Sequence, residues 1–206
     1  MLYIAHRINT AAQLAAVPPE YGIELDLRDD RDRIVLQHDP FITDAAEDFE
    51  EFLAGYRHRC LIANVKSERI EHRVREMLQQ FGVADYFFLD SSFPMMRLLA
   101  SQGETRQAVR FSEFEPIEYA LAMAGKVDWV WVDCFTRLPL DETSYVALRE
   151  HFRICIVSPE LQGHGTDRIA AFAQQLRPFR VDAVCTKRPD LWQAACPVGQ
   201  ACMTTE

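Results

Sequence analysis

Short apolar runs alternate with amphipathic stretches along almost the whole chain, and this alternation restricts the possible folds more than any other feature. Each run is bounded by polar or turn residues, as is typical of parallel strands that are buried on both faces. We therefore predict strands at Leu2–Ala5, Gly22–Leu27, Ile34–Leu36, Leu61–Val65, Tyr86–Leu89, Gln107–Phe111, Trp129–Val132, Arg153–Val157 and Val181–Cys185.

Helical periodicity fills most of the segments between these strands. In the stretch Ser67–Phe81 apolar residues recur at helical spacing, with Ser67 suited to the N-cap and Gly82 to the stop. The other predicted helices are Phe93–Ser101, Pro116–Ala124, Asp141–His151, Thr166–Leu176 and Pro189–Ala195. Strands that alternate with helices in this way are typical of α/β proteins with a parallel sheet.

The run Ile34–Leu36 is the exception to this alternation. It follows the second strand after only the charged turn Asp29–Arg33, whereas a parallel crossover needs about a dozen residues. We interpret it as a small hairpin extension after strand 2. Eight strand–helix units remain, and they predict a TIM (β/α)8 barrel. The barrel must be compact, because such barrels typically need about 250 residues and this chain has 206. An open doubly wound sheet is the alternative. We predict one domain over residues 1–195 and a poorly ordered tail over residues 196–206.

Charge and hydropathy argue against several kinds of partner. The net charge of −9, from 22 basic and 31 acidic residues, disfavours a nucleic-acid surface and a polybasic membrane patch. A small anionic substrate is still compatible, because arginine, lysine and a metal can form a positive pocket on an acidic protein. The segment from Met1 to His6 lacks a signal-peptide pattern and no stretch approaches 18 apolar residues, so we expect no stable membrane anchor and a cytoplasmic location.

Four cysteines lie in or beside apolar runs, namely Cys60, Cys134, Cys155 and Cys185. None of them has a Cys or His neighbour at zinc-finger spacing. We predict that they are reduced residues in or near the core. Cys196 and Cys202 fall in the predicted tail, where a disulfide is not implied.

The strand Gly22–Leu27 carries two carboxylates, Glu24 and Asp26, and their i, i+2 spacing puts both on one face. In a barrel strand that face is the interior, where two carboxylates repel each other and are costly to desolvate. A divalent cation between them removes this cost, and hard oxygen ligands suit Mg²⁺ or Ca²⁺. The alternative is a strand with one solvated polar face.

Polar residues at the ends of other strands are candidates too, because active-site residues of a parallel barrel gather at the carboxyl ends of its strands. His6 and Arg7 end the first run, and arginine suits bidentate contacts to phosphate. His38, followed by Asp39, comes after the hairpin, where an imidazole can act as acid or base near neutral pH. The alternative for either histidine alone is a structural or surface role.

The strand Leu61–Val65 is followed by a lysine that needs an explanation. Asn64 and Lys66 lie on one face, and Lys66 requires an anionic partner, such as phosphate or metal-bound carboxylates, unless it reaches solvent. Weaker candidates at the ends of later strands are Arg110, Asp133, Glu160 and Lys187.

The order of these residues resembles the glycerophosphodiester phosphodiesterase family, which belongs with the phosphatidylinositol-specific phospholipase C barrels. The resemblance rests on His6-Arg7, Asn9-Thr10, Glu24-Leu-Asp26, Val35-Leu-Gln-His38-Asp39, Ser92-Phe93 and Thr186-Lys-Arg-Pro189-Asp190. It implies a TIM-type barrel that hydrolyses a small phosphodiester of lipid metabolism with a bound divalent metal. It further implies that His6 and His38 are the acid–base pair. Arg7 would bind the phosphate, Lys66 would stabilise charge near it, and Glu24 and Asp26 would be metal ligands.

The chain departs from the family pattern at several positions. Ile8 replaces a glycine, and the glutamate before Asn9-Thr10 is missing. Asn64 replaces a glutamate that is normally a metal ligand, so one negative charge is lost although an amide oxygen can still ligate. Glu160 is then a candidate to supply the missing carboxylate.

Asn64 also motivates an alternative function, namely a catalytically weak or inactive barrel that binds a phosphorylated small molecule without turnover. A second alternative keeps the chemistry and changes the substrate, for example to a sugar-phosphate diester or a lysophospholipid.

Overall fold

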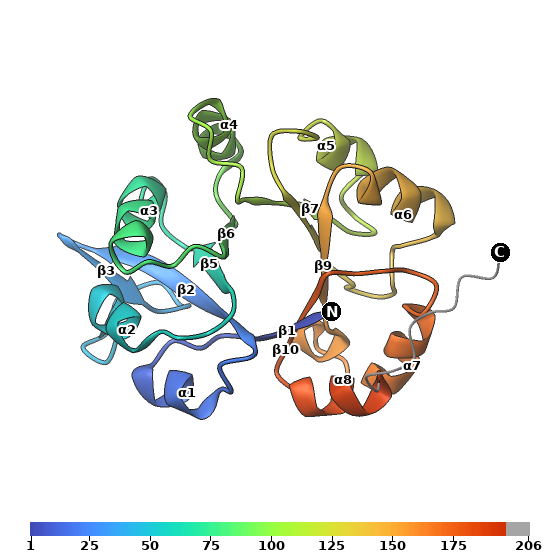
Figure 1. The fold of residues 1–206 in the computed structure, drawn as a ribbon, viewed down its shortest axis with the longest axis horizontal. Coiled ribbons are helices and arrows are strands. Elements are labelled where there is room, and N and C mark those ends of the chain that lie inside the picture. Colours follow the sequence, from blue (N-terminus) through green and yellow to red (C-terminus); the bar gives the residue numbers. More distant parts are fainter. Residues whose placement is uncertain (197–206) are drawn as a thin grey trace. The chain divides into compact units, whose positions relative to one another are not determined.

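The computed structural model describes residues 1–196, and the predicted tail therefore lies almost entirely outside the described residues. The chain divides into two compact units. The N-terminal unit comprises residues 4–108, and the C-terminal unit comprises residues 1–3 together with the segment from Val109 onward. Figure 1 traces the elements along the chain, and each unit is described here by itself.

The N-terminal unit is built on parallel strands, which follow the order β1 (Leu2–Ala5), β2 (Gly22–Asp30), β5 (Leu61–Val65) and β6 (Tyr86–Leu89). Of β1, only Ile4 and Ala5, the two residues that pair with β2, belong to this unit. The strand β3 (Arg33–Leu36) runs antiparallel to the end of β2 and pairs in turn with β4 (Glu47–Asp48). The helices are α1 (Ala11–Ala16), α2 (Phe49–Gly55), α3 (Glu71–Gln80) and α4 (Phe93–Ser101).

The helices α1 and α2 were not among the predicted helices, because they are six and seven residues long and too short to show a periodic pattern. Both begin with recognisable caps. Thr10 and Gln13 form a capping box at α1, and the side chain of Asp48 accepts hydrogen bonds at the start of α2. Such caps are a usable signal even where periodicity is absent.

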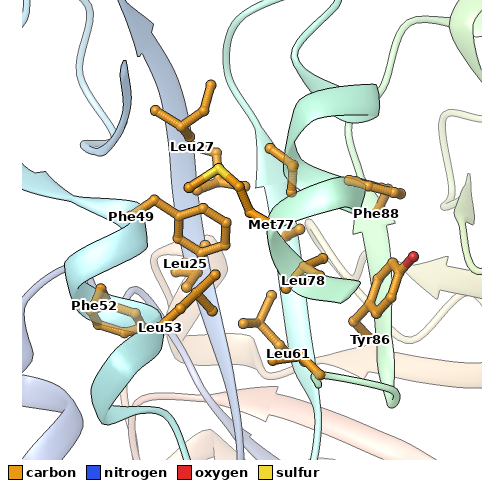
Figure 2. Close-up of a cluster of buried hydrophobic side chains, with 14 of the residues drawn as sticks. Leu25, Leu27, Phe49, Phe52, Leu53, Leu61, Met77, Leu78, Tyr86 and Phe88 are labelled. Atoms are coloured by element: carbon orange, nitrogen blue, oxygen red, sulfur yellow. The ribbon is translucent and has the colours of Figure 1, made fainter. Parts of the chain in front are cut away.

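One face of β2 builds the core of this unit. Leu25 and Leu27 pack among aromatic and aliphatic side chains of α2 and α3 (Figure 2), including Phe49, Phe52, Leu53, Met77 and Leu78. Burying each of these side chains contributes roughly 1.5–3 kcal/mol. Because side chains alternate along a strand, this packing fixes the opposite face as the one that carries Glu24 and Asp26.

Gly22 lets the strands of this unit approach each other closely at the start of β2. A Cβ atom at this position would lie 2.4 Å from Cδ1 of Ile4 and 3.0 Å from the carbonyl oxygen of Cys60. A larger residue here would require the Ile4 side chain to move and the backbone at Cys60 to shift slightly.

The C-terminal unit repeats the alternation of strands and helices. Its strands follow the order β7 (Ala108–Phe111), β8 (Trp129–Val132), β9 (Arg153–Val157) and β10 (Ala183–Thr186), and β8, β9 and β10 are parallel. Its helices are α5 (Ile117–Leu121), α6 (Glu142–Arg149), the 3-10 helix η1 (Pro159–Gln162), α7 (Arg168–Gln175) and α8 (Pro189–Ala195). The predicted mixed α/β class with parallel strands is confirmed.

Two further predictions concern burial and hydropathy. Cys60, Cys134, Cys155 and Cys185 are buried, as predicted. Within residues 1–196, no helix combines the length and the apolar character that crossing a membrane would require.

Candidate active site

Two carboxylates on β2 form the centre of the site. The side chains of Glu24 and Asp26 are each 1% exposed. Burial, together with the neighbouring charge of Asp26, raises the pKa of Glu24 to about 7. Two acids held this close in a dry environment favour a proton or a cation between them, which is the situation that their spacing predicted.

Arg7 follows the end of β1 and contacts both carboxylates. Its backbone has a φ of 58°, a left-handed conformation that costs a non-glycine residue about 1–2 kcal/mol. In this conformation its N–H donates to Oε2 of Glu24 at 2.7 Å, and its Nε lies 3.8 Å from Oδ2 of Asp26. This strained conformation brings Arg7 to both acids, and strained backbone of this kind is common at functional sites.

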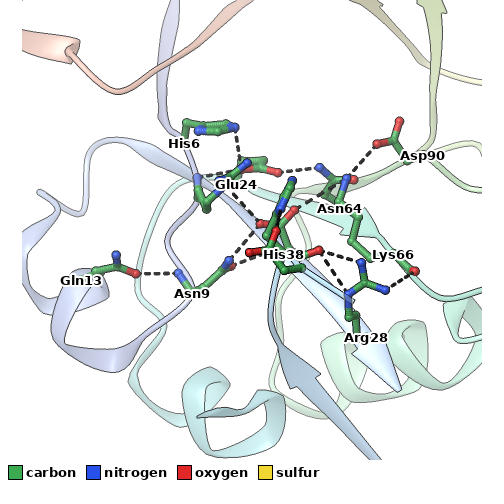
Figure 3. Close-up of polar contacts among 12 residues, drawn as sticks. His6, Asn9, Gln13, Glu24, Arg28, His38, Asn64, Lys66 and Asp90 are labelled. Atoms are coloured by element: carbon green, nitrogen blue, oxygen red, sulfur yellow. Dashed lines mark hydrogen bonds and ion pairs between the residues drawn. The ribbon is translucent and has the colours of Figure 1, made fainter. Parts of the chain in front are cut away.

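His6 and Lys66 approach the carboxylates from the ends of two different strands (Figure 3). Nε2 of His6 lies 3.7 Å from Oε2 of Glu24. Nζ of Lys66 lies 3.7 Å from Oδ1 of Asp26 and 3.1 Å from Oδ2 of Asp90. The structure therefore brings both residues to the acids, as the strand-end argument predicted.

Asn9 holds Asp26 through a reciprocal pair of hydrogen bonds. Its Nδ2 donates to Oδ2 of Asp26, and its Oδ1 accepts from the Asp26 backbone N–H, both at 2.9 Å. The backbone N–H of Asn9 in turn donates to Oε1 of Gln13 at 2.8 Å. Sequence reasoning quoted Asn9 as part of a motif but gave it no role. Here it ties the capped start of α1 to an acid of the site.

His38 lies on the loop after β3, where Asp39 and the end of β2 position it. Its Nδ1 lies 2.7 Å from Oδ1 of Asp39, and this hydrogen bond holds the pKa of Asp39 below its usual range. The preceding residue, Gln37, donates its backbone N–H to the carbonyl of Asp26 at 3.0 Å. The residue before His38 is thus tied to the backbone of a buried acid, while Asp39 contacts Nδ1 of the His38 ring.

Arg28 is a residue of the site that sequence reasoning missed. Its Nε and Nη2 donate to the carbonyl of His38 at 3.2 and 2.7 Å, and its Nη1 donates to the carbonyl of Lys66 at 3.0 Å. A signal was present, because Arg28 continues the i, i+2 series of Glu24 and Asp26 along β2. Asp90, the partner of Lys66 at the end of β6, was missed as well and follows the same strand-end rule.

Asn64 pairs in register with Asp26 on the neighbouring strand, and each of the two side chains has one oxygen that takes part in no hydrogen bond. Nδ2 of Asn64 donates to Oε1 of Glu24 at 2.8 Å, while Oδ1 of Asn64 and Oδ1 of Asp26 are buried without a hydrogen-bond partner. Such unsatisfied oxygens suit a hard divalent cation. Glu24, Asp26 and Asn64 therefore fit a metal, although within residues 1–196 no group of three or more His, Cys, Asp or Glu residues is arranged to hold one.

The remaining candidates lie in the C-terminal unit and have partners of their own. Glu160 accepts hydrogen bonds from Oγ1 of Thr186 at 2.5 Å, from the N–H of Lys187 at 3.0 Å and from the hydroxyl of Ser158. Arg110 pairs with Asp133, which also accepts from Nε2 of Gln162 at 2.8 Å. Within their unit these groups link the ends of neighbouring strands. A metal-binding role for Glu160 stays a prediction.

The fold is shared with solved structures of one enzyme class, the glycerophosphodiester phosphodiesterases. One, from Agrobacterium tumefaciens, is 17% identical, with a TM-score of 0.70, and the match covers 95% of this chain and 98% of that one. Another, a glycerophosphoryl diester phosphodiesterase from Parabacteroides distasonis, is 13% identical, with a TM-score of 0.68, and the match covers 94% and 85%. No family model matches the chain, and no curated protein does. The resemblance seen in the motifs is thus confirmed at the level of the fold.

Proposed function

We propose that the chain is a metal-dependent phosphoric diester hydrolase acting on glycerophosphodiester-like substrates. The observation that carries the proposal is the buried pair Glu24 and Asp26, with His6 beside one acid and Arg7 and Lys66 beside the other. The buried carboxylates favour binding of a divalent cation. Together with Arg7 and Lys66, that cation would suit a phosphate ester better than a neutral substrate. The shared fold supports the same reaction class.

Glu24, Asp26 and Asn64 would hold the cation, with Oδ1 of Asp26 and Oδ1 of Asn64, which take part in no hydrogen bond, as the first ligands to consider. When bound, Mg²⁺ or Ca²⁺ would supply neutralisation of the charge on the phosphodiester. Arg7 and Lys66 would bind the non-bridging oxygens, and arginine suits this role because its planar guanidinium forms paired hydrogen bonds.

His6 and His38 would divide the proton transfers. One imidazole takes a proton from the nucleophile, which is a neighbouring hydroxyl of the substrate or a water molecule, and the other gives a proton to the leaving alkoxide. Asp39 keeps Nδ1 of His38 engaged, so that Nε2 is the atom that exchanges the proton. The two histidines must begin in opposite protonation states, and the rate should therefore pass through a maximum with pH.

Substitution of each histidine tests this assignment. His6→Ala and His38→Ala should each lower turnover of an activated phosphodiester by about 10²–10⁴-fold. His72→Ala, on the partly exposed face of α3, is the matched control and should keep full activity. Wild-type turnover by either of the first two variants would refute the assignment.

A binding protein without turnover is the second candidate, and Asn64 is the observation that favours it. Calorimetry separates the two functions. If a phosphate monoester binds while neither Mg²⁺ nor Ca²⁺ does, and no diester is cleaved, the binding function is correct. Comparing glycerophosphocholine with sugar-phosphate diesters and lysophospholipids then identifies the alcohol that an active enzyme prefers.

We also propose that the eight strands of the parallel series form one closed barrel over residues 1–195. The strand order within each unit supports this, because β1 pairs through its last residues with β2 and the backbone N–H of Leu2 donates to Asp182, just before β10. The match to solved structures over 95% of the chain also supports a single domain.

A further inference from the structure

We infer that Asn9 is a positioning residue that fixes which oxygen of Asp26 faces the proposed cation, and that it thereby shifts the preference of the site towards Mg²⁺ and away from Ca²⁺. The inference rests on the proposed function for the presence of a metal, but not on the cleavage of any substrate. All the residues concerned lie in the N-terminal unit. Oxygen ligands alone suit either cation, so a preference has to come from the residues around the acids.

The four carboxylate oxygens of Glu24 and Asp26 differ in their surroundings. Both oxygens of Glu24 accept a hydrogen bond, Oε2 from the backbone N–H of Arg7 at 2.7 Å and Oε1 from Nδ2 of Asn64 at 2.8 Å. Oδ2 of Asp26 accepts from Nδ2 of Asn9 at 2.9 Å. Oδ1 of Asp26 is buried and takes part in no hydrogen bond. Asp26 therefore offers one oxygen, and not two, to a ligand.

The orientation of the Asn9 amide follows from its partners. A backbone N–H can only donate, so the Asn9 atom that lies 2.9 Å from the N–H of Asp26 is Oδ1, and Nδ2 is left to face the carboxylate. One side chain thus contacts both the backbone and the carboxylate of the same residue. This pair of hydrogen bonds holds the Asp26 carboxylate in one orientation, in which Oδ2 is engaged and Oδ1 is left for a ligand.

Asn9 is itself held in place from both sides. Its backbone N–H donates to Oε1 of Gln13 at 2.8 Å (Figure 3), and the same oxygen accepts from the N–H of Thr10 at 3.1 Å in the capping box of α1. The preceding residue, Ile8, donates its N–H to the carbonyl oxygen of Glu24 at 2.8 Å. The segment between β1 and α1 is therefore tied both to β2 and to the helix start, and this gives the Asn9 side chain a fixed base from which to orient the acid.

The preference between the cations follows from the number of oxygens that Asp26 offers. Mg²⁺ requires near-ideal octahedral geometry, whereas Ca²⁺ takes more ligands in a flexible geometry and binds carboxylates through one oxygen or both. While Asn9 engages Oδ2, binding through both oxygens of Asp26 would break a hydrogen bond. Asn9 therefore disfavours Ca²⁺ more than Mg²⁺. Removal of a residue that orients a metal ligand typically weakens metal binding by about 10–100-fold.

Calorimetric titration of the full chain with Mg²⁺ and with Ca²⁺ tests this inference without a substrate. Asn9→Ala removes both contacts to Asp26 and should weaken Mg²⁺ binding about tenfold, because the carboxylate is no longer oriented. Ca²⁺ binding should change much less, because the freed Oδ2 can join Oδ1 as a ligand. Asn9→Ser, whose shorter side chain cannot reach both groups of Asp26, should shift the ratio of the affinities in the same direction and serves if Asn9→Ala does not fold.

Thr10→Ala is the matched control, because it removes the side-chain cap of α1 and no contact to Asp26. It should lower the unfolding temperature by about 2–4 °C and leave the affinities for both cations unchanged. A purely structural role of Asn9 would lower the unfolding temperature in the same way, without a shift in the ratio of the Mg²⁺ and Ca²⁺ affinities.

The outcomes separate this inference from the proposed function. An unchanged ratio of affinities in the folded Asn9 variants would overturn the inference, as would an equal shift of the ratio in Thr10→Ala. A wild-type chain that binds neither cation would overturn it together with the proposed metal site. A shifted ratio in a chain that cleaves no diester would support the inference and refute the hydrolase alone.

Discussion

At the scale of single residues, Asn64 should decide how strongly the proposed metal site holds a cation. Asn64→Asp adds a third buried carboxylate and removes the hydrogen bond from Nδ2 to Glu24. Without metal, we expect the variant to lose about 1–3 kcal/mol of stability, because the new charge has no partner. With Mg²⁺ or Ca²⁺ the loss should be reversed, since an added carboxylate tightens divalent-cation binding.

Thermal unfolding with and without the two cations checks this prediction. Gln79→Glu, on the exposed face of α3, adds the same charge away from the site and serves as the control. If the cations raise the unfolding temperature of Asn64→Asp no more than that of Gln79→Glu, then Asp26 and Asn64 do not form a cation site.

At the scale of elements, Arg28 joins the end of β3 to the end of β5. It binds the carbonyls of His38 and Lys66, and so links the proposed acid–base residue to the proposed phosphate-binding residue. Arg28→Gln should lower kcat at least about tenfold with a smaller change in KM, because misplacing catalytic groups raises the barrier. Arg28→Lys should restore part of kcat. Steady-state kinetics alongside Arg73→Gln, an exposed position on α3, provide the measurement. An unchanged kcat in Arg28→Gln would show that the two loops keep their places without it.

The junction of β7 and β8 should be sensitive to pH. Burial raises the pKa of Asp133 to about 6, against the lowering effect of Arg110. The folded chain then holds a proton that the unfolded chain releases between pH 3.8 and about 6. Stability from this group is therefore full below pH 3.8 and is lost as the pH rises through about 6, by up to about 3 kcal/mol. The difference in unfolding free energy between wild type and Asp133→Asn should follow this curve in urea titrations. A difference that is constant between pH 4 and pH 7 would contradict it.

At the scale of the whole molecule, a closed barrel requires the two units to unfold together. All three tryptophans, Trp129, Trp131 and Trp192, lie in the C-terminal unit, whereas far-ultraviolet circular dichroism reports helices of both units. Urea unfolding followed by tryptophan fluorescence and by circular dichroism should give coincident transitions. Separate midpoints would show two independent domains instead of one barrel.

Much of this architecture could be predicted from the sequence, for physical reasons that differ between elements. Buried strands such as β5 and the long helix α3 were predicted because burial imposes a continuous apolar run or a helical period. The short helices α1 and α2 were missed, because capping and tertiary packing stabilise them more than any periodic pattern does.

The residues of the candidate site also fall into those that could be predicted from the sequence and those that could not. Glu24, Asp26, His6, Arg7 and Lys66 were predicted from strand-end position and alternation, and the structure brings them together. Arg28 continues the i, i+2 series of β2, but its contacts with backbone carbonyls of two other elements could not be predicted from that position. The reciprocal contact between Asn9 and Asp26 could not be predicted from the sequence either.

The central claim is that the acids of β2 and the two histidines cleave a phosphodiester. The most direct measurement is the ³¹P spectrum of glycerophosphocholine incubated with Mg²⁺ or Ca²⁺ and either the wild-type chain or the His6→Ala variant. We predict that the diester resonance is replaced by that of a phosphate monoester in the first sample and persists in the second. Equal conversion in both samples, or none in the wild-type sample with any diester supplied, would contradict the account.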